Sequence, residues 1–227
     1  MKWIILISIM AVLSGVIFAQ AATGKAKISI KSDGAHTENV GKDKYVTEYP
    51  NATITLDDMV LTANKVVQNT DNNVHVFTAT GNPVFKDKEN TITGTTIKAY
   101  TSPRFVEVTG EIKMINKPDP AKNDGKSEAT TVTCTNMTYD YATKTAKFNG
   151  NVKAVQNGKV VVADNAIYES ESEMLYLTGN IKMKNNDKEE LRSMQTAESV
   201  TMSLVDEWMD ILAKKGEQVE FIFEIDE

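Results

Sequence analysis

The chain has 227 residues, a formal net charge of −6 at pH 7 and a single cysteine, Cys134. An acidic chain lacks the basic face that nucleic acids require, which argues against a nucleic-acid partner. One cysteine excludes an internal disulfide and cysteine-rich zinc sites, because both need more than one thiol.

The segment 1–21 has the layout of a secretory signal peptide. Lys2 precedes the apolar run IILISIMAVLSGVIFAQAA, and Ala19-Gln20-Ala21 supplies the small-x-small pattern of a cleavage site. The apolar run is shorter than the roughly 20 residues of a membrane-spanning helix. We therefore expect a cleavable signal peptide over 1–21, with retention of the segment as a membrane anchor as the alternative.

The segment 22–53 is expected to hold an N-terminal strand and a polar loop. AKISIKS (26–32) alternates apolar and polar residues, which is typical of a strand, and HTENVGKDK (36–44) is predicted to be the loop. ATITLDDMVLTA (52–63) predicts a hairpin that turns at Asp57-Asp58. The main domain is placed at 54–227.

A glycine phrase recurs along this domain. Gly81, Gly110, Gly150 and Gly179 are each followed by Asn or Glu, and the steps between them are 29 (81 to 110), 40 (110 to 150) and 29 (150 to 179). The long step contains NKPDPAKNDGKSE, whose prolines and charges indicate an inserted surface loop over 116–128. A repeated unit of about 29 residues indicates stacked supersecondary units. A looser copy begins at Gly216.

Each glycine phrase is predicted to be a β-strand. In AKFNGNVKA (146–154), apolar residues and Gly150 alternate with Lys and Asn, and the other copies share this period of two. The glycines fall on the apolar side, where a glycine within a strand indicates a bend. A small residue stands before each glycine at a nearly constant offset, which is 18 for Ala63 and 16 for Gly94, Cys134 and Ala163. The pattern predicts an all-β structure that curves around one apolar interior.

The C-terminal segment allows two interpretations. SLVDEWMDILAKKG (203–216) could form an amphipathic helix that ends at Gly216, with one apolar stripe made of Leu204, Trp208, Ile211 and Leu212. It could also form a hairpin that turns near 206–207, and the repeat favours this hairpin. QVEFIFEID (218–226) is expected to be a last strand.

Three of these phrases resemble the OstA/LptA-type proteins of lipopolysaccharide transport. They are FTATGNPVF (77–85), FNGNVKAVQNGKVVVADNAIY (148–168) and YLTGNIKM (176–183). The residues that match the family phrases are Phe148, Gly150, Asn151, Val152, Gln156, Gly158, Ala163, Asp164 and Tyr168. The resemblance extends over about residues 54–223.

The resemblance implies an open β-jellyroll of stacked antiparallel strands in the periplasm. Members of the family form a bridge between the inner and outer membranes, and the acyl chains of lipopolysaccharide travel inside an apolar groove. The implied partners are lipopolysaccharide or a related lipid, other transport components that add to the terminal strands, and further copies arranged head to tail. The expected groove residues are Phe77, Val106, Val108, Ile112, Phe148, Val152, Leu175, Leu177, Ile181 and Met183. The same residues would also serve as an ordinary core.

Two other functions remain open at this point. The chain could be an inner-membrane-tethered, LptC-like component of the same machinery, or a structural or polysaccharide-acting β-solenoid. We expect no enzyme activity, metal or cofactor, and assign no catalytic residue. The two histidines, His36 and His75, are not expected to meet, and no pair of carboxylates has the spacing of a glycosidase.

Overall fold

The computed structural model describes residues 28–117, 128–184, 192–204 and 209–218. The expected signal peptide, the centre of the inserted loop and the expected last strand lie outside these residues. No helix in the described part is long and apolar enough to cross a membrane.

The described chain is built from β-strands, which confirms the predicted fold class. Every pairing is antiparallel, and the strands form one continuous 17-stranded array. The strands are β1 (Ile28–Lys31), β2 (His36–Gly41), β3 (Lys44–Leu56), β4 (Met59–Asp71), β5 (Val74–Thr80), β6 (Val84–Lys86), β7 (Asn90–Thr93), β8 (Thr96–Thr101), β9 (Arg104–Asn116), β10 (Thr130–Asp140), β11 (Thr145–Gln156), β12 (Lys159–Glu169), β13 (Met174–Thr178), β14 (Lys182–Lys184), β15 (Arg192–Ser193), β16 (Ala197–Ser203) and β17 (Met209–Ala213). Antiparallel pairing argues against the β-solenoid alternative, since β-helices stack their strands in parallel.

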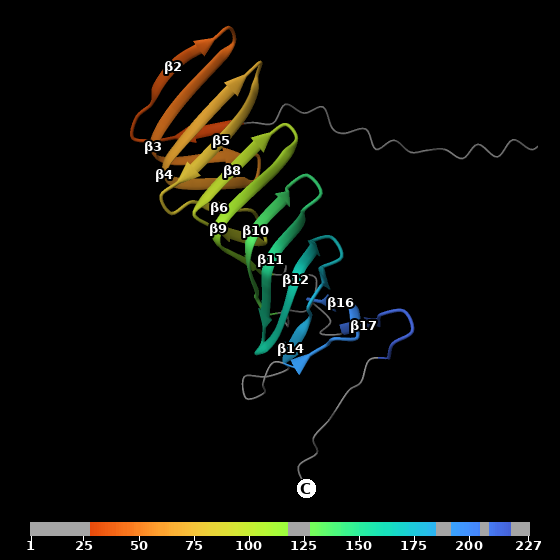
Figure 1. Cartoon of the computed structure of the whole chain (residues 1–227). Helices are drawn as coiled ribbons and strands as arrows, with labels where there is room; N and C mark the ends of the chain where they lie inside the picture. The colour runs from red at the N-terminus through yellow and green to blue at the C-terminus, as the bar shows by residue number, and fades with distance from the viewer. Residues whose placement is uncertain (1–27, 118–127, 185–191, 205–208, 219–227) are drawn as a thin grey trace, which may run out of the picture.

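The strands stack in succession along one axis, from β2 and β3 at one end to β16 and β17 at the other (Figure 1). The stacking follows from the repeat, because each unit cannot bury its apolar face alone and covers the unit before it.

Six long strands bend near their middles and divide the array into two sheets. β4 pairs with β6 through its first residues and with β5 through its last residues. β9 pairs likewise with β8 and then with β7, and β12 with β14 and then with β13. We call the part that contains β2, β5, β8, β13, β16 and β17 sheet I, and the part that contains β1, β6, β7, β14 and β15 sheet II. The long strands β3, β4, β9, β10, β11 and β12 cross from one sheet to the other.

The bends of β9 and β11 lie at the repeated glycine phrase, as predicted, and the same phrase separates β5 from β6 and β13 from β14. Both residues of each phrase adopt positive φ, with angles of 71° and 58° at Gly81-Asn82, 69° and 41° at Gly110-Glu111, 78° and 51° at Gly150-Asn151, and 76° and 44° at Gly179-Asn180. Glycine reaches this left-handed region at little cost, and Asn tolerates it better than most residues. The local sequence therefore determines where β9 and β11 bend and where β5 and β13 end.

The glycine also makes room for the neighbouring strand. A Cβ on Gly110 would overlap Thr95 Oγ1, and one on Gly179 would lie 2.6 Å from Asp164 Oδ2. The backbone nitrogens of Thr95 and Asp164 donate hydrogen bonds to the carbonyl oxygens of these glycines, at 2.9 and 2.8 Å. The predicted inward position of the glycines is wrong, because Gly81 is exposed and the other three are only half-buried.

The strands that pair with a glycine phrase, such as β12 and β10, bend without a glycine. On β12, Ala163 and Ala166 are buried while the two residues between them are exposed, so the inward phase shifts by one residue. β10 has the same arrangement with Thr135 and Asn136 exposed, and its register with β11 shifts there. The small residue noted before each glycine is thus the last inward residue before the bend.

The strands near the ends of the array differ in part from those predicted. The polar loop predicted over 36–44 is wrong: 36–41 form β2, which pairs with β3 although all six of its residues are exposed. Strand pairing there comes from backbone hydrogen bonds, which leave no apolar pattern in the sequence. The hairpin favoured over a helix near the C-terminus is confirmed by the pairing of β16 with β17, and its expected turn at 206–207 lies outside the described residues. AKISIKS contains β1, and Asp57-Asp58 joins β3 to β4, as predicted.

Candidate functional site

All ten predicted groove residues face the same interior between the two sheets. Nine are at most 2% exposed, and Met183 is partly buried against the same apolar cluster. Phe77, Val106, Val108, Phe148, Leu175 and Leu177 come from sheet I, whereas Ile112, Val152, Ile181 and Met183 lie beyond the bends on the side of sheet II. The fold therefore gathers these residues into one elongated apolar layer.

The two sheets are in contact across this layer. The ring of Phe85 on β6 packs edge-on against Tyr139 on β10 with centroids 6.1 Å apart, and its centroid is 6.3 Å from that of Tyr141. Phe85 belongs to sheet II and Tyr139 to sheet I, so the side chains fill the space between the sheets in this structure. Lipid would enter this layer only if the sheets moved apart.

The side of the layer opposite the bends is held closed by side chains. We call this side the mouth, because no strand crosses it in the described part of the chain. Five of the contacts between a residue of sheet II and one of sheet I form a series along this side, and we call these five the mouth ladder. They are Asp57–Arg104 at 2.6 Å, Asp87–Tyr139 at 2.5 Å, Glu89–Ser170 at 2.8 Å, Asn116–Tyr168 at 2.9 Å, and Gln156 to the carbonyl oxygen of Leu204 at 2.8 Å.

The central contacts of the ladder are buried and connected. Asn116 Nδ2 donates to Tyr168 Oη and, at 3.0 Å, to Asn90 Oδ1; the amide of Asn90 donates in turn to Tyr139 Oη at 3.4 Å. Asp87 Oδ2 accepts a hydrogen bond from the hydroxyl of Tyr139. Buried polar groups cost free energy unless they are hydrogen-bonded, so these residues stabilise one another only while the mouth is closed.

The tyrosines of the ladder remain neutral donors and acceptors. Burial is the main cause that raises the pKa of Tyr139 far above its usual value, and the adjacent Asp87 carboxylate raises it further. Burial likewise raises the pKa of Tyr168, an effect that the hydroxyl of Ser170 partly opposes. Each intact hydrogen bond contributes about 1 kcal/mol to stability.

Sequence reasoning missed the ladder, although a signal for it was present. Asn90, Asn116 and Gln156 occupy inward positions at the ends of sheet II strands nearest the mouth, where the alternation would place an apolar residue. The polar residue ends an otherwise apolar row, and it indicates a buried hydrogen bond rather than a gap in the core. The partners could not be found in this way, because they lie 48 to 52 residues away.

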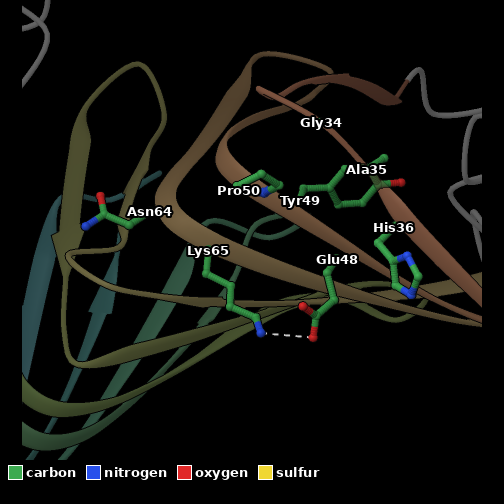
Figure 2. A pocket seen from close by; sticks show the side chains of 8 residues that line it. All are labelled: Gly34, Ala35, His36, Glu48, Tyr49, Pro50, Asn64 and Lys65. Carbon is green, nitrogen blue, oxygen red and sulfur yellow. Dashed lines mark hydrogen bonds and ion pairs between the residues drawn. The ribbon is translucent and has the colours of Figure 1, made fainter.

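A surface hollow of about 480 Å³ lies near the first strands (Figure 2). It is lined by Gly34, Ala35, His36, Glu48, Tyr49, Pro50, Asn64 and Lys65. Lys65 Nζ and Glu48 Oε1 form an ion pair at 2.9 Å within it, so these two charges compensate each other. The hollow lies outside the apolar interior and brings together no reactive pair that would suggest catalysis.

The two histidines lie in different surroundings. His75 Nδ1 bonds to Gln68 and Thr70 on the inner face of sheet I, the face that carries Phe77, whereas His36 bonds to Glu38 on the exposed strand β2. Among the described residues, no group of three or more His, Cys, Asp or Glu side chains is arranged to hold a metal ion.

Comparison with known proteins gives a structural likeness. No family model matches the sequence, and no curated protein matches it. The chain is similar in structure to LptH from Pseudomonas aeruginosa, described as the LptA-homologous periplasmic component of the lipopolysaccharide transport device. The two share 14% identity over 70% of this chain and 95% of that chain, with a TM-score of 0.43.

Proposed function

We propose that this chain is a non-enzymatic periplasmic protein of lipopolysaccharide transport that shelters acyl chains between sheets I and II. The observation that carries the proposal is the continuity of the interior: each repeat adds inward apolar residues to one layer that extends along the stack. The sequence phrases shared with the OstA/LptA-type proteins support the lipid assignment.

The energetics of acyl chains set the requirement that such an interior meets. Transfer of one methylene out of water is worth about 0.8 kcal/mol, so a chain of a dozen carbons gains roughly 10 kcal/mol from a sheltered path. A row such as Phe148, Leu175 and Leu177 supplies apolar surface of this kind. We propose that these and the other seven predicted groove residues contact the acyl chains, while the polar headgroup stays outside.

The terminal strands support assembly into a bridge. β2 pairs only with β3, and β17 only with β16, within the described part of the chain. Unpaired strand edges can accept a further strand from another chain. Val40 on β2 is 57% exposed and Leu212 on β17 is 60% exposed, which offers apolar contact beside each edge. We propose that transport components, or further copies of this chain, add at these edges.

The segment 1–21 decides between a free and a tethered protein. Cleavage at this site would release a periplasmic carrier, whereas retention would give the tethered, LptC-like alternative. Intact mass of the exported protein distinguishes them, because cleavage removes this whole segment.

Photo-crosslinking tests the interior as a lipid site. A benzophenone amino acid replaces Phe148 or Leu177 in the interior, and Lys153 on the exposed face of β11 serves as the control. We expect lipopolysaccharide adducts from positions 148 and 177 and few from 153. Equal adduct yields at all three positions would contradict the proposal, provided that circular dichroism shows each variant folded.

A further inference from the structure

The mouth ladder recurs along the stack in step with the repeat. Four of its five contacts join residues 47 to 52 positions apart, and the fifth joins residues 81 apart. Each contact links the end of a sheet II strand, or the turn beside it, to sheet I. Ordinary core packing requires no such series, since apolar residues at these positions would close the mouth without desolvating polar groups.

The two long sides of the interior are joined by bonds of different kinds. At the bends, the backbones of β4, β9, β10, β11 and β12 run continuously from one sheet to the other. At the mouth, each contact of the ladder involves at least one side chain. Separation of the sheets therefore breaks side-chain contacts at the mouth and leaves the covalent chain and the strand ladders intact.

The bends have the features of hinges. In β9 and β11 the bend contains a glycine, and its pair of left-handed residues interrupts the regular register, as between Asn149 and Val152 of β11. Hinges are a few positions that absorb changes of φ and ψ while the elements on either side stay rigid. A small change at each bend would widen the mouth along its whole length.

We propose that the mouth ladder is a lateral gate, through which acyl chains enter the interior sideways rather than by threading from the ends of the stack. This inference rests on the proposed lipid-carrier function and specifies its route of entry. The acyl chains separate the sheets, break the ladder contacts and replace the inter-sheet apolar contacts. Headgroups too polar for the interior remain outside the mouth.

A crosslink across the mouth tests the route directly. Lys88 lies in the exposed turn of sheet II beside Asp87, and Thr143 lies in the exposed turn of sheet I that follows Tyr139. With Cys134→Ser as background, Lys88→Cys and Thr143→Cys are joined by a short bifunctional maleimide. The matched control joins Thr143→Cys to Ser172→Cys, whose positions both lie in sheet I turns. The probe is fluorescently labelled lipopolysaccharide, and the readout is its rate of loading.

We expect the cross-mouth crosslink to slow loading at least about tenfold, because it prevents the sheets from separating at the mouth. The control crosslink should leave the rate of loading unchanged. Equal loading by both crosslinked proteins would overturn the gate and leave the carrier function standing. Failure of the uncrosslinked protein to bind lipopolysaccharide would overturn both.

A second experiment weakens the gate instead of locking it. Tyr139→Phe with Tyr168→Phe removes two ladder hydroxyls and keeps both rings in the core, and Tyr176→Phe on β13, outside the ladder, is the control. We expect the double variant to load the labelled lipid roughly tenfold faster, because two hydrogen bonds no longer resist opening. Spin labels at positions 88 and 143 should report a longer mean distance when lipid is added. Faster loading by the control to the same extent, or an unchanged distance, counts against the gate.

Discussion

Asn116 at the end of β9 donates a hydrogen bond of 2.9 Å to the hydroxyl of Tyr168 on β12, and so joins sheet II to sheet I across 52 positions of sequence. The same amide bonds to Asn90 at 3.0 Å, and Asn116 is only 3% exposed. This residue thus connects two neighbouring parts of the mouth in a site with little access to water.

Replacement of this amide should destabilise the protein. Asn116→Ala removes the donor to Tyr168 and Asn90 and leaves both acceptors buried, so we expect a loss of about 1–3 kcal/mol in the free energy of unfolding. Urea denaturation measures it. Asn149→Ala, at an exposed position of β11, should change stability by no more than about 0.5 kcal/mol. Equal effects of the two substitutions would show that the buried network adds nothing.

The bends should not tolerate a side chain. Gly110→Ala forces a φ of 69° on alanine and drives its Cβ into Thr95 Oγ1, so we expect a loss of at least about 1–3 kcal/mol. Gly34→Ala is the control, because no atom lies within 4 Å of its added Cβ.

A second substitution separates the two causes of that loss. Adding Thr95→Ala to Gly110→Ala removes the hydroxyl that the new Cβ would meet, while the left-handed backbone strain of about 1–2 kcal/mol remains. We expect partial recovery of the unfolding midpoint. Full recovery would contradict the role of backbone conformation at the bend.

Alkaline pH should weaken the mouth. Burial raises the folded-state pKa of Tyr139 and Tyr168 above the unfolded value near 10, so the folded state binds more protons above that pH. Their contribution is complete below pH 10 and is lost as the pH rises beyond it. Unfolding free energies at pH 9 to 11 should therefore fall, and Tyr139→Phe should reduce the slope. The same slope in wild type and variant would argue against this origin.

The single thiol should react slowly in the folded protein. Burial raises the pKa of Cys134 from 9.0 to about 11, although hydrogen bonds with the backbone of Asn149 and Asn136 oppose the shift. Only the thiolate reacts with iodoacetamide, so we expect the alkylation rate to keep rising up to about pH 11 in the native protein. In urea the rate should level off near pH 9, the usual range of an exposed thiol. Identical pH profiles in both conditions would show that the native environment has no effect.

The local features of this fold could be predicted from contiguous residues. The alternation in AKFNGNVKA determines which side chains of β11 face inward, since a strand points successive residues to opposite faces. Gly150-Asn151 determines the position of the bend, because those two residues accept left-handed backbone conformations. All ten predicted groove residues consequently lie where the alternation placed them, although their contact with lipid is still a proposal.

The tertiary structure decided what depends on distant parts of the chain. β2 escaped prediction because its strand state comes from backbone pairing with β3, and its own side chains all face solvent. The mouth ladder could not be predicted, because the role of a polar residue such as Asn116 depends on its hydrogen bond to Tyr168. Only the packing of one sheet on the other brings these two residues together. Periodicity and backbone preference are properties of neighbouring residues, whereas closure of the mouth depends on which strand ends meet in space.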